Sequence, residues 1–598
     1  MDKRQSIVVL GAGYAGVTAV KKLCKKLKPY KDQYRVVLID RRPYHTLLTD
    51  LHEVAGGRIE SEKVLIDLRK LFGHLDVEVI TDEIVGVDYD QRKVSLEGGD
   101  VIDYRFLVMG LGSQTSFFGI PGVEENSLTL WSYEDALKIR EHIQHQFDRA
   151  RGIKNSEKRR QMLTFTVAGG GFTGVEMAGE LGEWVKTLCE HYEISRQDVR
   201  VILVEAQDKL CPMFHVKQTL KIQKRLHKLG VEVLLNSPIT EAKKGAFTIK
   251  GRDAIPTNTL IWTAGVVCNQ FVKETGISTA RHQRAQANDF LQSVDHDNVY
   301  LIGDNAYLEN DGKPILQVVE TAVQTADVAA ENIINQIKGA ELHAFKPNYH
   351  GFMVSVGGRY AVADVMGMKL SWLFAMALKH LVNVHYLWEI GGFAVVWHYL
   401  YAEFFNMTQN RSILGGHASR TSHVFFLVPL RIYLGVMWLI EGVKKVQDGW
   451  LDPENIFIIQ VEGVAGASEA WEEASEGVAQ IVPIFEQPPA IFQWFMDTFI
   501  AQAPFLFQAS VVIMEIAIGL ALIGGLFTVL ASVGSMFLGF NFILSAMADW
   551  SILWYIITPI AFIGGGGRAL GLDYYVMPVL KRFWKRLGIV RRLRIYID

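Results

Sequence analysis

The chain has 598 residues, a formal net charge of −3 and 49% hydrophobic residues. This length predicts two to four domains, and the nearly balanced charge gives no indication of nucleic-acid binding. The four cysteines (Cys24, Cys189, Cys211 and Cys268) form no C-x-x-C or C-x-x-x-x-C pair. We therefore expect a reducing compartment, no disulfide framework, no metal site and no dithiol relay beside a flavin. Residues 1–5 are polar, and no signal peptide is expected.

A glycine-rich turn follows the first apolar strand of the chain. Residues 7–10 are expected to form a buried parallel strand, a helix follows to about residue 28, and the next strand, 34–39, ends at an acid. The glycines let the backbone approach phosphates, and the acid can accept hydrogen bonds from ribose hydroxyls. These elements in this order predict dinucleotide binding, whereas the glycine motif alone would be a weak signal. The expected contacts are Gly11, Ala12, Gly13, Gly16, Asp40 and Arg41.

A polar-aromatic segment and several short strands follow the first acid. We interpret His45, within residues 41–54, as structural rather than catalytic. Residues 106–112 form a further apolar strand that ends in glycines. The short strands, interpreted as a meander inserted in this unit, are 77–80, 84–89 and 93–96.

The same pattern occurs a second time. An apolar run, 163–168, leads into glycines at G-x-G-x-x-G spacing, and the strand 199–204 ends at Glu205, which repeats the position of Asp40. A carboxylate there favours a ribose diol and repels a 2′-phosphate, so this site is expected to prefer NADH to NADPH; the alternative is an ordinary solvated acid. The expected contacts are Gly169, Gly171, Thr173, Gly174, Glu205 and Gly265.

Two further features could face the redox centre. Glu176 lies in the first turns of the helix after the second glycines, close to where a nicotinamide could stack on a flavin, although a plain surface acid is an equal alternative. The strand 298–302 ends at Gly303 and Asp304, where an acid can bond the ribityl or pyrophosphate region of a flavin nucleotide. The helix 318–333 that follows could point its N-terminus at the flavin ring.

The order GAGYAG, GGGFTGVE, WTAG and IGD, with the helix after it, resembles the type II NADH:quinone oxidoreductases over about residues 5–415. These are single-chain, FAD-containing respiratory dehydrogenases that do not pump protons. The resemblance implies an α/β fold with two glutathione-reductase-like dinucleotide-binding domains. FAD would lie on residues 1–115 and 266–345, including Gly303 and Asp304, and NADH on residues 116–265.

The chain departs from this family where the quinone is expected. The family helix usually reads A-Q-x-x-x-Q, but here Glu320 takes the place of the first glutamine, and only Gln324 is kept. A proline-leucine pair after the first acid is replaced by Thr49-Asp50. Lys379 lies in a segment similar to one that brings a lysine near the flavin, the alternative being a lysine that snorkels on a membrane-surface helix. The candidate catalytic residues are Glu176, Glu320, Gln324 and Lys379.

The C-terminal third is far more apolar. Residues 346–420 are expected to hold a membrane-surface anchor, because 372–405 mixes aromatic and aliphatic residues with scattered charges. Residues 421–598 resemble the DoxX-like four-helix membrane family. The residues that carry this resemblance are Arg431, Glu441, Gly442, Val443, Lys444, Glu515, Gly567, Arg568, Gly571 and Asp573. The first expected span is 424–440 and the fourth is 550–563. The uncharged run 516–548 holds parts of the other two, which join near Gly524-Gly525, and the first of these begins before Glu515.

Charges in this part indicate a topology. Residues 451–508 contain no Lys or Arg, whereas 581–594 is strongly basic, which places the C-terminus in the cytoplasm. Lys444 and Lys445 fit this topology poorly. Arg431 and Glu515 would be costly in lipid unless paired, so they are either functional or a buried structural ion pair.

The sequence therefore predicts a multi-pass enzyme of the cell membrane with its catalytic domains on the cytoplasmic face. NADH would reduce FAD, and a lipid quinone (menaquinone or ubiquinone) would accept two electrons. Alternatives are another flavin-quinone enzyme, such as a sulfide:quinone oxidoreductase, or a flavoprotein that passes electrons to a membrane partner through the DoxX-like part. Membrane lipid is an expected partner, and a homodimer is one option for the assembly.

Overall fold

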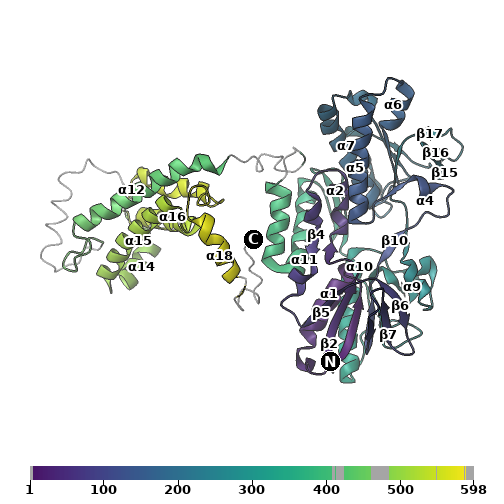
Figure 1. Ribbon diagram of the computed structural model, residues 1–598, viewed down its shortest axis with the longest axis horizontal. Helices are drawn as coiled ribbons and strands as arrows, with labels where there is room; N and C mark the ends of the chain where they lie inside the picture. Colours follow the sequence, from purple (N-terminus) through teal and green to yellow (C-terminus); the bar gives the residue numbers. More distant parts are fainter. Residues whose placement is uncertain are drawn as a thin grey trace. The chain divides into compact units, whose positions relative to one another are not determined.

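The computed structural model divides into two compact units, Met1–Arg420 and Thr421–Asp598. It describes residues 4–406, 411, 423–458, 484–485, 487–546, 548–584 and 586. The first unit contains all the strands of this described part, and the second is helical (Figure 1). The acids expected between 459 and 483, and the basic residues 587–594, lie outside the described residues.

A five-stranded parallel sheet forms the base of the first unit, in the order β21–β9–β1–β2–β5. Its inner strands are continuous buried apolar runs, as expected for a parallel sheet covered on both faces. Helices α1 (Tyr14–Lys26) and α10 (Val319–Lys338) pack against each other beside it (Figure 1). The strands are β1 (Gln5–Leu10), β2 (Tyr34–Asp40), β5 (Val77–Thr81), β9 (Phe106–Met109) and β21 (Val299–Leu301).

One strand is placed differently from its prediction. We expected 77–80 in a meander, but β5 pairs in parallel with β2, from Val36 opposite Val77 to Asp40 opposite Thr81. As an edge strand β5 is only partly buried, which makes it look like an insertion strand in the sequence. The separate antiparallel sheet consists of β6 (Ile84–Asp88), β7 (Lys93–Leu96) and β8 (Val101–Asp103).

A second parallel sheet repeats this plan in the order β11–β18–β12–β13–β14. Its central strand β12 leads into the long helix α7 (Phe172–Tyr192), as β1 leads into α1. The second β-α-β unit is therefore a copy of the first. The strands are β11 (Leu128–Thr129), β12 (Thr164–Ala168), β13 (Arg200–Val204), β14 (Val231–Leu234) and β18 (Thr259–Trp262).

A three-stranded antiparallel sheet and a long helix complete the first unit. Helix α11 (Leu373–Leu400) follows the sheet, contains a non-helical residue at Gly392, and continues into η7 (Tyr401–Phe405). Its outer face carries large exposed apolar side chains, while its inner face is buried. The sheet consists of β25 (Gly351–Ser355), β26 (Ala361–Val365) and β27 (Met368–Trp372).

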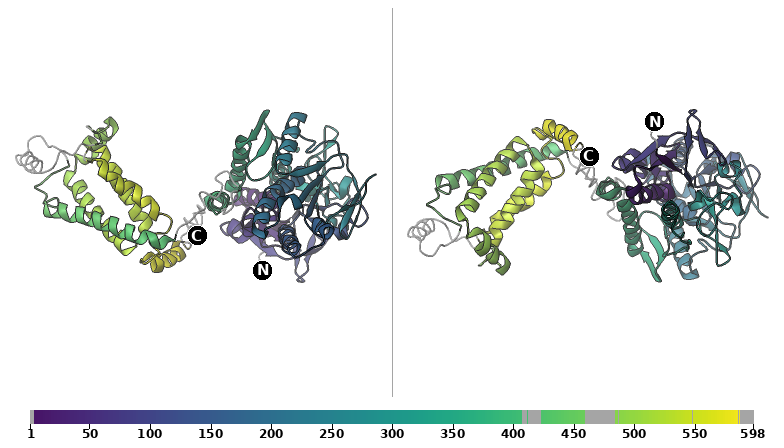
Figure 2. Two further views of the ribbon diagram at one scale, coloured as in Figure 1. Left: turned by 90° about the horizontal axis from the view of Figure 1, so that it is seen from above. Right: turned by 90° about the horizontal axis from the view of Figure 1, so that it is seen from below.

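The second unit is a bundle in which α12 (Val428–Gln447), α15 (Pro504–Gly524) and α16 (Thr528–Leu544) pack together (Figure 2). Within its described part, the two segments Val424–Gln447 and Pro504–Gly524 are long and apolar enough to cross a membrane. Helix α15 ends at Gly524, and Gly525 follows with φ +63°. The predicted join between two helices near Gly524-Gly525 is therefore confirmed. Residues 550–562 instead form short helical pieces.

The buried charges of this bundle have partners other than each other. Arg431 donates hydrogen bonds to backbone carbonyls between Gly566 and Leu570. Glu515 forms an ion pair with Lys445, a lysine that the predicted topology left unexplained. Arg431 and Glu515 therefore do not pair with each other, but Glu515 does form a buried ion pair, as the structural alternative expects.

Candidate active site

The first glycine turn forms an anion cradle at the start of α1. Gly11 has φ +94°, and a Cβ at Gly16 would collide with the carbonyl oxygen of Gly11, so the turn requires glycine at both positions. Helix α1 begins after Gly13 without a side-chain cap, and a Cβ on Gly13 would meet no protein atom within 4 Å. The start of α1 is thus open at Gly13 and has no side-chain cap, which fits the approach of a pyrophosphate.

Asp40 joins the end of β2 to this cradle. Its carboxylate accepts hydrogen bonds from the backbone N–H groups of Ala12 (2.6 Å) and Arg42 (2.8 Å). Burial raises the pKa of Asp40 above its usual value, while these two N–H groups favour the charged form. The neighbouring Arg41 is exposed, lies 3.8 Å from Glu83, and favours the charged form of Asp40.

Gly303 and Asp304, which are far from the first glycine turn in the sequence, close the same cradle. A Cβ on Gly303 would lie 3.2 Å from the Cβ of Ala15 on α1 and 3.5 Å from that of Ala322 on α10. The Ser113 hydroxyl donates a hydrogen bond to Asp304, whose pKa is raised by burial. The structure therefore brings the two segments predicted for one nucleotide together.

The second glycine turn has the same geometry at the start of α7. Gly169 has φ +112°, a Cβ on Gly174 would collide with the carbonyl oxygen of Gly169, and a Cβ on Gly171 would meet nothing. Helix α7 also lacks a side-chain cap. Glu205 accepts hydrogen bonds from Gly170 N and from Gln207 N (2.7 Å), as Asp40 does in the first cradle.

Two other predicted contacts line this turn less directly. Thr173 lies exposed in the first turn of α7. Gly265 has φ +80°, and a side chain there would collide with the ring of Phe118. Both lie beside the cradle without a direct role in its shape.

Glu176 lies one turn further along α7 and faces the protein interior. The backbone N–H and the hydroxyl of Ser355 both donate hydrogen bonds of 3.2 Å to Glu176 Oε1, and His52 Nδ1 lies 3.6 Å from Oε2. Burial raises the pKa of Glu176 to about 8. The alternative of a plain surface acid is therefore wrong, and the group holds a proton at neutral pH.

Lys379 points from α11 into the same interior. It forms an ion pair with Glu53 and lies 3.5 Å from Asp50 Oδ1, and its side chain is 9% exposed. Burial alone would lower the pKa of Lys379, but the two carboxylates raise it well above its ordinary value. The lysine is thus an internal cation rather than a snorkelling surface residue.

Arg58 contacts three carboxyl groups in a fully buried cluster that no pattern in the sequence predicts. It contacts Glu53, Glu180 of α7 at 3.0 Å and Glu403 of η7 at 3.3 Å. Arg411 adds a second cation on Glu180 at 2.6 Å. The cluster joins the helix of the second cradle to the C-terminal end of the long apolar helix.

The predicted residues at the N-terminus of α10 have different partners. Gln324 exchanges two hydrogen bonds with the backbone of Asn348 (2.6 and 2.9 Å). Glu320 accepts a hydrogen bond from the His350 side chain and another from its backbone N–H. Both side chains therefore fix the loop before β25, whereas Lys379 belongs to the buried cluster.

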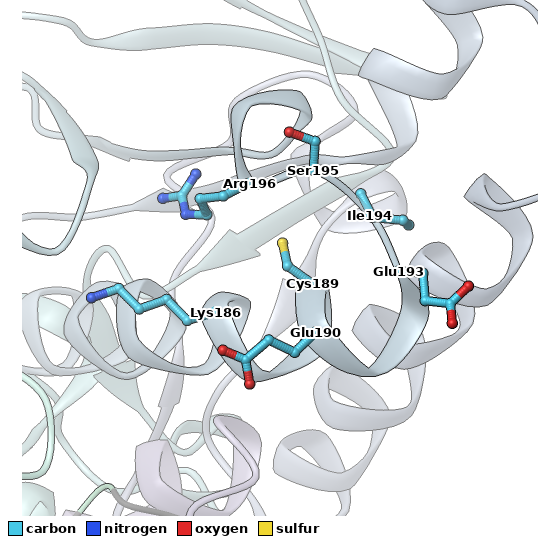
Figure 3. Close-up of a pocket in the computed structure, with 7 residues that line it drawn as sticks. All are labelled: Lys186, Cys189, Glu190, Glu193, Ile194, Ser195 and Arg196. Carbon is cyan, nitrogen blue, oxygen red and sulfur yellow. The ribbon is translucent and has the colours of Figure 1, made fainter.

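A pocket of about 580 Å³ lies at the opposite end of α7 (Figure 3). Lys186, Cys189 and Glu190 reach it from the helix, and Ser195 and Arg196 from the loop that follows. Since α7 has 21 residues, this end is about 31 Å from the glycine turn. The pocket is separate from the candidate active site. All four cysteines are free.

Comparisons with known proteins agree with this geometry. The family model described as pyridine nucleotide-disulphide oxidoreductase matches residues 5–329. A type II NADH:quinone oxidoreductase of Staphylococcus haemolyticus is 30% identical over 394 residues, which are 65% of this chain and 96% of that protein. A protein of the same name from Staphylococcus aureus strain NCTC 8325 is 28% identical over the same coverage.

Two solved structures share the fold. NDH2 from Plasmodium falciparum in complex with NADH has a TM-score of 0.60 at 18% identity, covering 68% of this chain and 99% of its own. The sulfide:quinone oxidoreductase from Aquifex aeolicus has a TM-score of 0.55 at 18% identity, covering 65% and 91%. At this level of identity, the structural similarity shows the α/β fold alone.

Proposed function

The chain belongs to the pyridine nucleotide-disulphide oxidoreductase family, and on that premise we propose that it is a membrane-bound respiratory enzyme that does not pump protons. It is an NADH:quinone oxidoreductase with FAD as its cofactor and NADH as its electron donor. FAD is assigned to the first cradle, with Gly11, Gly13, Gly16, Asp40 and Asp304. NADH is assigned to the second, with Gly169, Gly171, Gly174 and Glu205.

One observation carries this proposal. The buried cluster connects α7, the helix of the second cradle, with α11 and η7, whose outer face is apolar. The donor side and the lipid side of the reaction are therefore joined through Glu180, Arg58, Glu53 and Lys379. A water-soluble nucleotide and a lipid-soluble quinone need such a shared interior.

The protein's residues would position the nucleotides, shield the reacting groups from water and neutralise the charge that develops on the quinone. Bound FAD would supply the redox chemistry, the transfer of two electrons between NADH and the quinone. The uncapped helix N-termini at Gly13 and Gly171 hold the pyrophosphates, and the carboxylate of Glu205 orients the adenosine ribose. Glu176 offers a protonated, neutral carboxyl beside the nicotinamide. Lys379 offers a cation to the negative charge that develops on the quinone oxygen.

Helix α11 is the proposed membrane-surface anchor. Its outer face exposes Phe374, Leu381, Trp388, Phe393 and Trp397, each of which is at least half exposed. Aromatic and aliphatic groups on one face of a helix favour the interface between lipid headgroups and acyl chains. This face would keep the active site next to dissolved quinone.

We assign the second unit to a DoxX-like domain with four spans and a cytoplasmic C-terminus. The two long apolar helices support this assignment, and the helix Thr528–Leu544 and the pieces at 550–562 would supply the remaining spans. Its topology would place the catalytic unit on the cytoplasmic face. Lys445 conflicts less with that topology because Glu515 neutralises it.

Steady-state assays of the full chain in lipid nanodiscs test the proposed function. We expect NADH to support reduction of a ubiquinone or menaquinone analogue and of ferricyanide, and sulfide to support neither. Glu176→Ala should lower NADH-dependent reduction of both acceptors, because it removes the neutral carboxyl that is assigned to the nicotinamide side of the site. Robust ferricyanide reduction with no quinone reduction in the wild-type enzyme would contradict the proposal.

A further inference from the structure

Asp50 is an acid that the family pattern does not provide, since Thr49-Asp50 stands where that pattern has proline and leucine. The side chain is 3% exposed and lies at the start of α2 (Leu51–Ala55). Its Oδ1 is 3.5 Å from Lys379 Nζ, and Asn383 Nδ2 donates to its Oδ2 at 3.3 Å. A buried carboxylate has thus been placed directly on the proposed quinone-side lysine.

The two acids on Lys379 differ in their other partners. Glu53 also binds Arg58, and although burial opposes ionisation, Arg58 and Lys379 hold the pKa of Glu53 well below its usual value. Asp50 has the lysine and a neutral amide for partners. Burial raises the pKa of Asp50 to about 6, despite the opposing charge of Lys379. Of the two acids, Asp50 is the one that can take up a proton near neutral pH.

The reaction consumes one proton. NADH gives up two electrons and one proton as a hydride, and the quinone gains two electrons and two protons to become a quinol. The balance is NADH + H⁺ + quinone → NAD⁺ + quinol. The second proton must therefore come from the medium and reach a quinone oxygen in a site shielded from water.

We propose that Asp50 is the proton-holding partner of Lys379, a positioning residue that restores the proton which Lys379 gives to the quinone. The inference rests on the proposed function. The N–H bond of the ammonium breaks as the quinone O–H bond forms. The carboxyl proton of Asp50 then moves to the lysine nitrogen, and a proton from the medium binds Asp50. The two electrons come from NADH, and Lys379 ends the cycle as a cation.

Asp50 changes charge between about pH 5 and about pH 7, whereas the titratable groups around it keep theirs in this range. Burial lowers the pKa of His52 and His380 to about 3, so both are neutral in this range. Three neighbours keep one charge throughout this range: Lys379 and Arg58 are cations with raised pKa values, and Glu53 is an anion. Burial raises the pKa values of Tyr14, Tyr399 and Glu403. The pKa of Glu176 is about 8, which is also above this range. Asn383 carries no charge.

The pH profile of quinone reduction tests the proposal on the full enzyme in nanodiscs. The competent form carries the proton, so the wild-type turnover should fall as pH rises through about 6, approaching tenfold per pH unit. Asp50→Asn keeps the shape of the side chain but cannot hold the proton. We expect its quinone turnover at pH 6 to drop by about tenfold or more, its profile to lose the step, and its ferricyanide rate to stay within about twofold.

Further variants and a second readout separate this role from a structural one. Asp50→Glu should show the fall in quinone turnover near pH 6 again, because it restores a carboxyl group. The control Glu62→Gln, which changes an exposed acid twelve residues further along the chain, should have the wild-type turnover and pH profile. Infrared difference spectra should show a carboxyl C=O band that titrates near pH 6 in wild type and disappears in Asp50→Asn. Wild-type turnover and profile in Asp50→Asn, or a persisting band, would overturn the proposal. If Asp50→Asn loses its FAD or melts early, the test uses Asp50→Glu instead. Absence of the carboxyl band and of the pH-dependent fall in turnover from Asp50→Glu would then also overturn the proposal. Wild-type enzyme without quinone turnover at any pH would instead refute the proposed function.

Discussion

Glu205 sets the nucleotide preference of the second cradle, and Glu205→Gln should relax it. The carboxylate is fixed by Gly170 N and Gln207 N at the end of β13, where a bound ribose is expected. A 2′-phosphate on that ribose would bring a second negative charge against the first. Glutamine keeps an acceptor for one of these two hydrogen bonds and removes the charge. The lost hydrogen bond affects both nucleotides alike, whereas the lost charge acts on NADPH.

The size of the effect follows from Coulomb repulsion. Two like charges about 5 Å apart repel by about 3 kcal/mol at an effective dielectric constant of about 20. Because Glu205 is only half-buried, salt and solvent reduce this to about 1.5–3 kcal/mol. The ratio of kcat/KM for NADPH to that for NADH should therefore rise roughly 10- to 100-fold.

Ferricyanide reduction with either nucleotide measures this ratio without involving the quinone. Glu190→Gln, at the far end of α7 (Figure 3), is the matched control and should leave the ratio unchanged. Higher ionic strength should reduce the difference in the NADPH/NADH ratio of kcat/KM between Glu205→Gln and wild type. An unchanged ratio in Glu205→Gln would show that this carboxylate does not face the ribose and would remove the basis for the assigned NADH preference.

Three further predictions address the cradle, the cluster and its pH dependence. Gly174→Ala should prevent formation of the second cradle and abolish NADH oxidation, whereas Gly171→Ala should fold normally and raise the KM for NADH, as thermal melts and kinetics would show. Arg58→Met should destabilise the first unit by about 3–5 kcal/mol because it removes the cation that three buried carboxyl groups share, while Arg35→Met, which breaks a surface pair, should change the melting temperature little. Since the folded-state pKa of Glu176 is raised, its contribution to stability is full at low pH and lost as pH rises through about 8; melts of Glu176→Gln should lack this loss.

The two cradles could be predicted because each is encoded locally. The acid and the glycine turn that it binds are 28 residues apart in the first copy and 35 in the second, within one β-α-β unit. The break at Gly525 was also visible, because an uncharged run longer than a bilayer core must turn. Periodicity and glycine spacing carry this information directly.

The buried cluster could not be predicted in the same way. Arg58 and Glu403 are 345 residues apart, and Lys379 and Glu53 are 326 apart, so no local pattern relates them. A lysine on an aromatic-rich helix has the same sequence signature whether it snorkels or turns inward. Only the contacts of Lys379 with Asp50 and Glu53 in the folded chain decide between the two. The unusual Asp50 was visible in the sequence, but its role became apparent only beside Lys379.

The central claim is that electrons pass from NADH through bound FAD to a quinone. Anaerobic titration of the purified full-length enzyme with NADH tests it most directly, followed by addition of a menaquinone or ubiquinone analogue. We expect one NADH per FAD to bleach the flavin absorbance and one quinone to restore it. A flavin that bleaches with NADH but stays reduced after the quinone is added would contradict the account.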